Sequence, residues 1–301
     1  MIIHIKIVVI IMFLTANIMG GLGNQLFQIF TTIAHAKRIA ADFIFIYSGY
    51  AGVGKARVTY WTTFLDKLLT HTTLNLDLEF TNKDVEQFSV YREDGFAYKP
   101  IPNFAGNEQN VKLFGYFQSY KYFEDEYKSI CDLIGIKTCQ AAVKEKYPLF
   151  FDVERRVISM HFRLGDYKRL QDYHPIMPYE YYYNALSHIM NYVNGEQIQV
   201  NYCCELEDNK IVKETVEKLN DKFPSIRFVK IDDDIEDWEQ LLIMSCSHDN
   251  IIANSSFSWW GAYFNGTQDK IVCYPHLWFG AAASHHDVRD MYPDAWEKIC
   301  F

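Results

Sequence analysis

The sequence lacks the cysteine patterns of a metal or disulfide scaffold. Its seven cysteines are an odd number, and no two of them have CxxC spacing. A zinc knuckle needs closely spaced cysteines, and a disulfide framework normally uses an even set, so neither is indicated. Reduced thiols in a cytosolic protein fit this pattern best. Positive charge is also scarce, because 29 Lys and Arg face 38 Asp and Glu, for a formal net charge of -9. A general nucleic-acid binder, which needs a basic face, is therefore not expected.

A long hydrophobic run is missing at the start of the chain. The apolar segment at residues 7–14 is shorter than the roughly 20 residues that a membrane-spanning helix needs. Two interpretations of residues 1–19 stay open: a signal peptide or Golgi-type membrane anchor, and a buried first strand. We favour the strand because a glycine-rich loop follows it at once, as a βα unit requires. We expect a cytoplasmic protein, with membrane association as the alternative.

The glycine-rich loop itself lacks the common nucleotide fingerprints. It reads MGGLGNQLFQ over residues 19–28, which is neither GxGxxG nor a GK[ST] loop. A predicted helix over residues 29–41 follows. A strand, a glycine turn and a helix start together form a backbone-donor site for an anion. Asn24 in this turn is a candidate either for capping the helix or for reaching a ligand.

Length and composition indicate a folded protein of two domains. The chain has 301 residues, of which 49% are hydrophobic and 16% aromatic, and this excludes disorder. We expect an N-terminal domain over residues 1–150 and a C-terminal domain over residues 151–301, linked through residues 144–152 around Pro148. In the first half we predict strands at residues 42–47 and 111–118 and a helix at residues 119–135.

The second half alternates regularly between strands and helices. Such alternation is typical of βαβ units on a parallel sheet. The predicted strands are residues 156–164, 197–203, 225–231, 250–253 and 270–274, and the predicted helices are residues 178–192, 209–223, 235–245 and 256–264.

The first of these strands carries the most distinctive stretch, SMHFRLGDY at residues 159–167. Side chains alternate along a strand, so His161 and Arg163 share a face near its carboxyl end. In an open α/β sheet charged groups emerge at that end, into the ligand crevice. Gly165 lets the chain turn and brings Asp166 to the same place. We interpret the stretch as the anion-handling end of an active site; the alternative is a surface ion pair beside a core histidine.

A second polar stretch, NSSFSWWGAY at residues 254–263, begins another predicted helix. Asn254, Ser255 and Ser256 at a helix start offer backbone N–H groups, hydroxyl donors and the positive end of the helix dipole, all suited to phosphate. Ordinary capping with packing of the two tryptophans is the alternative. A capping role accounts for one polar residue at a helix start, but it does not account for several in succession.

Together these stretches resemble the ordered motifs of the α-1,2-fucosyltransferases, glycosyltransferase family eleven. The matching segments are GGLGNQLFQ (residues 20–28), HFRLGDY (161–167), NSSFSWWGA (254–262), YPHLWF (274–279) and YPDAW (292–296). The resemblance implies an α/β fold of the GT-B type, with two Rossmann-like domains facing a central cleft. It also implies metal-independent, inverting transfer of L-fucose from GDP-β-L-fucose to the 2-hydroxyl of a terminal galactose in a glycan.

The resemblance also implies roles for particular residues. GDP-fucose is expected mainly on the C-terminal domain and the acceptor glycan on the N-terminal one, with no cofactor. Arg163 matches the motif arginine that meets the donor diphosphate, and His161 and Asp166 are its motif partners and the candidates for a general base. The remaining expected donor-binding residues are Gly23, Asn24, Gln25, Asn254, Ser255 and Ser256.

The chain departs from the family pattern at two places. Leu164 stands where a second arginine is common, and the acidic segment after the next strand appears only as CCELED, residues 203–208. A non-catalytic sugar-nucleotide or glycan-binding module and a GT-B transferase with another donor therefore stay open as alternatives. His285, His286 and Asp287 suggest a metal site only weakly, and we expect no bound metal.

Overall fold

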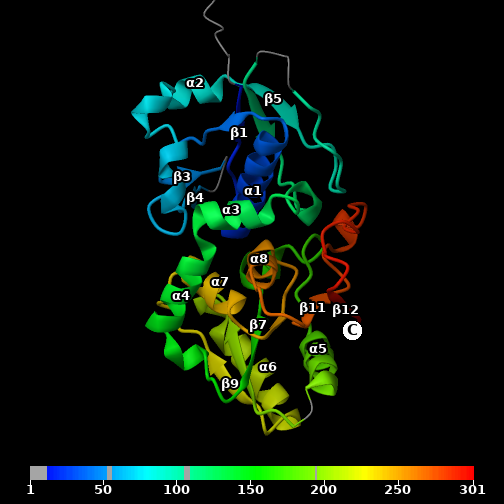
Figure 1. Ribbon diagram of the computed structural model, residues 1–301. Coiled ribbons are helices and arrows are strands. Elements are labelled where there is room, and N and C mark those ends of the chain that lie inside the picture. Colours follow the sequence, from blue (N-terminus) through cyan, green and yellow to red (C-terminus); the bar gives the residue numbers. More distant parts are fainter. Residues whose placement is uncertain (1–11, 53–55, 105–108, 194) are drawn as a thin grey trace, which may run out of the picture. The chain divides into compact units, whose positions relative to one another are not determined.

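The computed structural model describes residues 12–52, 56–104, 109–193 and 195–301, and the chain forms two compact units (Figure 1). The first unit contains residues up to Gly20 and Gln25–Ile134. The second contains Gly21–Asn24 and Gly135–Phe301. Residues 1–11, on which much of the question of a leader or anchor turns, lie outside the described residues. In the described part of the chain no helix is both long and apolar enough to cross a membrane.

The first unit is built on a small parallel sheet. Its four strands follow the order β2-β1-β6-β5, and every neighbouring pair is parallel. A short antiparallel pair, β3 with β4, stands apart from this sheet. The elements of the unit are β1 (Phe13–Ala16), α1 (Leu22–Arg38), β2 (Asp42–Phe43), β3 (Tyr50–Ala51), β4 (Arg57–Val58), α2 (Asn82–Glu86), β5 (Ser89–Arg92), β6 (Val111–Phe114) and α3 (Tyr127–Ile134).

Helix α1 begins at Leu22, seven positions before the predicted start. Gly20 adopts a left-handed conformation with φ 81°, which turns the chain sharply after β1. The helix then begins two residues later. Leu26, Phe30 and Ile33 of this helix are fully buried. The glycine-rich stretch is therefore mostly the first turns of a core helix.

Other predictions for the first half were partly wrong. The strand expected at residues 42–47 forms ladder pairs over Asp42–Phe43, and the one expected at residues 111–118 ends at Phe114, before Gly115. The helix expected at residues 119–135 is divided into a short 3-10 turn, Tyr120–Tyr122, and α3. The first half contains many aromatic residues and no regular alternation of polar and apolar residues. Its sequence therefore does not locate the ends of helices and strands well.

The division between the units also differs from the prediction. It falls between Ile134 and Gly135 instead of near residue 150. The expected link over residues 144–152 contains the end of α4 (Ile136–Lys146) and a 3-10 turn, Pro148–Phe150. Helix α4 packs on α7 (Asp237–Ser245) of the second unit. Lys146 and Tyr147 both bond to Glu239 of α7, at 2.7 and 2.8 Å. These contacts make residues 135–150 part of the second unit.

The second unit has a six-stranded parallel sheet of order β12-β11-β10-β7-β8-β9. The predicted alternation of strands and helices is confirmed, with small shifts at the ends and one further strand, β12, that the sequence pattern did not indicate. The remaining elements are β7 (Arg156–His161), α5 (Tyr179–Tyr192), β8 (Ile198–Cys203), α6 (Asn209–Lys222), β9 (Arg227–Lys230), β10 (Asp249–Ile251), α8 (Ser256–Tyr263), β11 (Val272–Pro275) and β12 (Glu297–Ile299).

Strand β7 lies at the centre of this sheet and is covered on both faces. Ile158, Met160 and Phe162 belong to a core cluster that includes Tyr182 and Leu186 of α5. On the other face, Ser159 accepts a hydrogen bond of 2.7 Å from Asn250, and the His161 ring lies 5.5 Å from that of Phe257 in α8. Beyond its first residue, Arg156, the strand therefore has no charged side chain until after its carboxyl end, where Arg163 and Asp166 follow.

An ion pair links the amino ends of β7 and β10. Arg156 forms two bonds with Asp249, Nε to Oδ2 at 2.6 Å and an Nη to Oδ1 at 3.0 Å, and the backbone N–H of Ile271 also donates to Asp249. Asp249 is fully buried, whereas Arg156 retains 20% side-chain exposure. Removing one partner of a buried pair leaves an uncompensated charge and an unsatisfied N–H group.

We expect Asp249→Ala to lower the free energy of unfolding by about 3 kcal/mol or more. The matched control is Glu196→Gln, because the exposed Glu196 lies 3.6 Å from the same arginine and should contribute little. Denaturant unfolding of the three proteins measures both effects. Equal stability of the two variants would show that burial of Asp249 does not decide the strength of this pair.

Glu93 in the first unit gives a pH-dependent prediction. Its Oε2 accepts hydrogen bonds from the backbone N–H groups of Tyr116 and Phe117, at 2.7 and 3.0 Å. Burial raises the pKa of Glu93 from about 4.5 to about 7, against the opposing effect of these two bonds. The folded chain therefore favours the protonated carboxyl, and the stability that Glu93 contributes is complete below about pH 4.5 and is lost as the pH rises through about 7.

Glu93→Gln keeps an oxygen acceptor and removes the buried charge. We expect this variant to be more stable than the parent protein near pH 8, by up to about 3 kcal/mol, and equally stable at low pH. Asp94→Asn is the control, since Asp94 is exposed and paired with Lys99. Thermal unfolding over this pH range gives the comparison, and a constant difference between Glu93→Gln and the parent protein would refute the titration of Glu93.

Candidate active site

Three loops of the second unit meet beside the carboxyl end of β7. The sheet register pairs His161 with Cys203 of β8 and Met160 with Ile251 of β10. Counting onward from these pairs brings Arg163 level with Glu205 on one side and with Asn254 on the other. Neighbouring strands thus deliver the two polar stretches singled out in the sequence to one edge of the sheet, which is where α/β sheets bind ligands.

The Arg163 guanidinium is held by groups from two of these loops. One terminal nitrogen pairs with Asp166 at 2.5 Å, and the other forms a closer pair with Glu205. The guanidinium also lies over the Tyr167 ring, 4.9 Å from its centroid. The ring and the two carboxylates fix the planar fork at the sheet edge, with one-fifth of its side chain exposed, 21%. Arg163 and Asp166 thus form an ion pair beside the buried His161, an arrangement that fits both interpretations of this stretch, and the anion-binding role stays a prediction.

His161 is buried at the end of β7, beneath this arginine. Burial, helped by the positive charge of Arg163, lowers the pKa of His161 to about 3. The imidazole is therefore neutral near pH 7. Its Nδ1 has no hydrogen-bond partner among the described residues. A general base works best with a pKa near the operating pH, so this histidine is better suited to hydrogen bonding than to accepting a proton.

Asn254 connects the loops instead of presenting a free amide. Its Nδ2 donates to the backbone carbonyls of Pro175 and Trp278, at 2.9 and 3.1 Å. Its own backbone carbonyl accepts a bond of 3.1 Å from the Tyr167 hydroxyl. Both amide hydrogens are thus committed to the protein, which argues against the expected role of the Asn254 amide as a donor to phosphate. Asn254 ties the loops after β7, β10 and β11 together.

The first turn of α8 follows directly. Ser255 precedes the helix with extended backbone angles, φ -142° and ψ 126°, and Ser256 is its first residue. The Ser256 hydroxyl donates to Asn24 Oδ1 at 2.7 Å, inside the second unit, to which Gly21–Asn24 belong. The backbone of Gly23 lies against the same turn. Asn24 was expected in the N-terminal domain, whereas the structure places it beside Ser256 in the second unit. The donor-binding roles of Asn24, Ser255 and Ser256 stay predictions.

Gln25 does not join this group. Its side chain is 1% exposed, and its Nε2 donates to the backbone carbonyls of Gly20 and Val58, at 3.0 and 2.8 Å. It faces the interior of the first unit because α1 begins earlier than predicted, so position 25 falls within the buried stripe of the helix. The expected donor-binding role of Gln25 is not supported by this placement.

Glu205 is a site residue that was not among the sequence candidates, and Gly165, which was expected only to turn the chain, has a second role beside it. Gly165 has φ +41°, and a Cβ there would lie 2.6 Å from Glu205 Oε2, so the glycine makes room for the carboxylate. The register between β7 and β8 could have revealed Glu205, since position 205 follows β8 as position 163 follows β7. A single sequence does not give that register.

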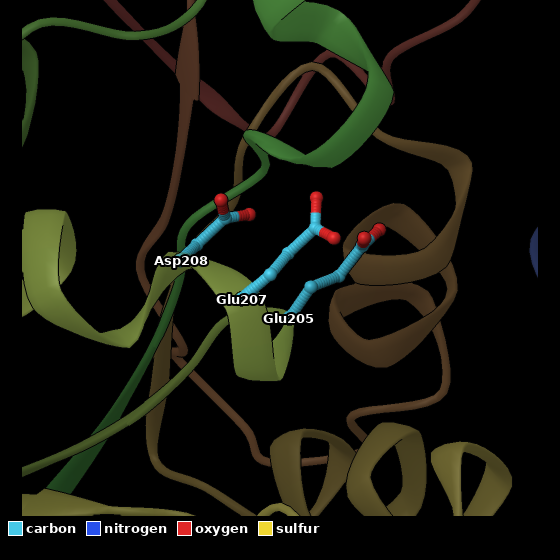
Figure 2. Close-up of side chains that lie close together, drawn as sticks. All are labelled: Glu205, Glu207 and Asp208. Atoms are coloured by element: carbon cyan, nitrogen blue, oxygen red, sulfur yellow. The ribbon is translucent and has the colours of Figure 1, made fainter.

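The acidic side chains after β8 form the cluster shown in Figure 2. One oxygen from each of Glu205, Glu207 and Asp208 lies within 4.8 Å of the others. Lys168 pairs with Asp208 at 2.6 Å and with Glu207 at 3.3 Å, while Arg163 pairs with Glu205. Each carboxylate thus has a basic partner from the loop after β7. The cluster stabilises that loop and gives no separate indication of a metal ion.

The histidines near the C-terminus are arranged as a surface feature. The rings of His285 and His286 lie 4.2 Å apart, and Asp287 pairs with Arg289 at 2.7 Å. Within the described ranges these three residues do not form a group with metal-ligand spacing. The absence of a metal requirement stays a prediction.

Comparisons of sequence place this geometry in a family context. The model of the family described as "Glycosyl transferase family 11" matches residues 10–299. The O-antigen biosynthesis glycosyltransferase WbnK of Escherichia coli is 26% identical over 312 residues, which cover 93% of this chain and 98% of the relative. An alpha-1,2-colitosyltransferase of Escherichia coli is 24% identical over 301 residues, covering 94% and 98%.

Solved structures give the fold class. POFUT1 in complex with GDP-fucose superposes with a TM-score of 0.52 at 10% identity, over 88% of this chain and 98% of that one. A mutant of Arabidopsis thaliana FUT1 in complex with GDP gives 0.50 at 9% identity, over 94% and 75%. At such low identity the likeness concerns the fold alone. With its parallel sheets, the chain has a GT-B type fold, as predicted.

The close approach of Gly23 to α8 yields a stability prediction. A Cβ at position 23 would lie 2.3 Å from the backbone carbonyl carbon of Ser256, whereas one at Gly21 would meet nothing within 4 Å. Backbone atoms cannot move aside cheaply, so we expect Gly23→Ala to cost about 1–3 kcal/mol and Gly21→Ala to cost little. Denaturant unfolding provides the measurement. Unchanged stability of Gly23→Ala would mean that this turn does not pack on α8 in solution.

Proposed function

Because the chain belongs to glycosyl transferase family 11, we propose that it transfers L-fucose from GDP-β-L-fucose to the 2-hydroxyl of a terminal galactose in a glycan, with inversion. That it is a glycosyltransferase with a fucosyltransferase-like fold rests on the family match and the structural likeness. The donor, the linkage and the stereochemistry are the proposal. The observation that carries it is the convergence of Arg163 and the first turn of α8 at the ends of neighbouring strands.

The proposed chemistry depends on charge at the leaving group. When the bond between the fucose C1 and the phosphate oxygen breaks, its electron pair stays on GDP and negative charge grows there. Preorganised donors aimed at such charge are worth about 3–4 kcal/mol each. Arg163 supplies a guanidinium that stays charged, and the backbone N–H groups and the dipole at the start of α8 supply a second set of donors.

The other site residues have supporting roles in this proposal. Ser256 and Asn24 lie beside the same helix start, and Gly23 allows their close approach. To donate to a phosphate, the Ser256 hydroxyl would exchange the hydrogen bond that it now donates to Asn24 Oδ1. The neutral His161 contributes a hydrogen bond, because a pKa near 3 makes it a weak proton acceptor. Asp166 is engaged by Arg163, so we assign no protein base. As the acceptor oxygen bonds to the fucose C1, its proton passes to water or to a phosphate oxygen of the departing GDP. No cofactor or metal is needed for this chemistry.

One comparison favours a second donor. The alpha-1,2-colitosyltransferase matches 94% of this chain. A nucleotide-linked colitose is therefore the alternative donor for the same site. The non-catalytic module is the third candidate, since Leu164 and not a second arginine follows Arg163. A transfer assay with both donors and a panel of galactose-terminated acceptors, with NMR of the product linkage, separates these candidates.

Arg163→Ala tests the diphosphate assignment directly. We expect it to lower the transfer rate at least about 100-fold and to weaken GDP binding in calorimetry, because the leaving charge loses its fixed cation. Leu164→Ala is the neighbouring control: Leu164 is 6% exposed within the core cluster, so its loss should mainly reduce stability. Unchanged GDP affinity in Arg163→Ala would remove the assignment. Stronger competition by UDP than by GDP would exclude the proposed donor.

A further inference from the structure

Arg163 already has anionic partners in the structure. Each of its two terminal nitrogens is paired with a different carboxylate, one from Asp166 and one from Glu205. An arginine binds phosphate best by offering two parallel N–H groups to two oxygens. Here both sides of the fork are occupied by protein carboxylates. A diphosphate that approaches Arg163 therefore meets carboxylate oxygens where its own would lie.

The local charge adds to this conflict. Arg163 with Asp166 and Glu205 carries a formal charge of one negative unit, so the group as a whole repels an anion. The two carboxylates are about half exposed, with side-chain values of 49% and 46%, so each retains contact with water. Exposed ion pairs are weak, commonly below about 1 kcal/mol, and can be exchanged for another anion at low cost.

Of the two carboxylates, Glu205 is the one placed to move. Asp166 follows Arg163 by three residues, at the start of the 3-10 turn Gly165–Arg169, so the short connection limits how far the two can separate. Glu205 comes from the loop after β8 on a longer side chain, and it reaches Arg163 over the bare α-carbon of Gly165. Among the described residues Arg163 is its one ion-pair partner. The neighbouring Glu207 and Asp208 are held by Lys168 instead.

We infer that Glu205 is a built-in competitor of the donor diphosphate for Arg163, and so sets the affinity for the nucleotide. This inference rests on the proposed function of Arg163. In the empty protein Glu205 keeps the guanidinium paired and in place. When the donor binds, the diphosphate displaces the Glu205 carboxylate into water. After transfer the carboxylate returns to Arg163 and favours the departure of GDP.

Glu205→Gln tests the inference, because glutamine keeps the size and an acceptor oxygen but removes the charge. We expect GDP to bind this variant about threefold to tenfold more tightly than the parent protein, and Glu205→Ala to show the same direction. Glu207→Gln is the matched control, since it removes an equal charge two residues away that does not touch Arg163. Isothermal titration calorimetry at one pH and salt concentration gives the dissociation constants, and thermal unfolding checks that each variant folds.

The outcomes separate the inference from the function beneath it. Absence of GDP binding to the parent protein would remove the proposed donor site. GDP binding that is weakened by Arg163→Ala but unchanged or weakened by Glu205→Gln would leave the function standing and overturn the competition. Equal tightening in Glu207→Gln would also overturn it, because the effect would then come from net charge alone. Tightening in the two Glu205 variants but not in the control supports the competition.

Discussion

The contact between Arg163 and the carboxylates beside it is the interaction on which the site depends. A guanidinium at the end of a buried central strand cannot stand alone, because burial of an unpaired charge is costly. Asp166 and Glu205 supply that pairing from two loops, and the Tyr167 ring supports the flat side of the fork. The pairing makes the charge tolerable in the empty protein, and the positive charge beneath it helps to keep His161 neutral. The two ion pairs thus hold the arginine in place, while burial, helped by the charge of the arginine, keeps the histidine neutral.

The scaffold makes this arrangement by simple means. Strand β7 is covered on both faces, so the polar groups of the site lie at its carboxyl end, where β10 and β8 end beside it. Asn254 then joins the loops after β7, β10 and β11 through its amide and its backbone carbonyl. Glycine is needed where backbones approach closely: Gly23 against α8, and Gly165 beneath Glu205.

The sequence was most informative where local pattern and tertiary structure agree. In the second half, strands and helices alternate with clear periodicity, and the predicted order was confirmed together with the family and the fold. Residue placement was predictable where a motif ends a strand, as at Arg163 and Asp166. It failed where the outcome depended on register or on the exact start of a helix. Gln25 is buried because α1 starts at Leu22, and the part played by Glu205 follows from the pairing of β7 with β8. The boundary was predicted near residue 150, around Pro148. It falls earlier because α4 packs on α7 of the second unit, and the sequence around Pro148 does not indicate that packing.

The central claim is that one diphosphate is bound jointly by Arg163 and the first turn of α8. A crystal structure of the protein with GDP tests it most directly. The account predicts phosphate oxygens within hydrogen-bond distance of the Arg163 guanidinium and of the backbone N–H groups at the start of α8, with the Glu205 carboxylate turned away. GDP bound with its phosphates remote from both groups, while the Arg163–Glu205 pair stays closed, would contradict it.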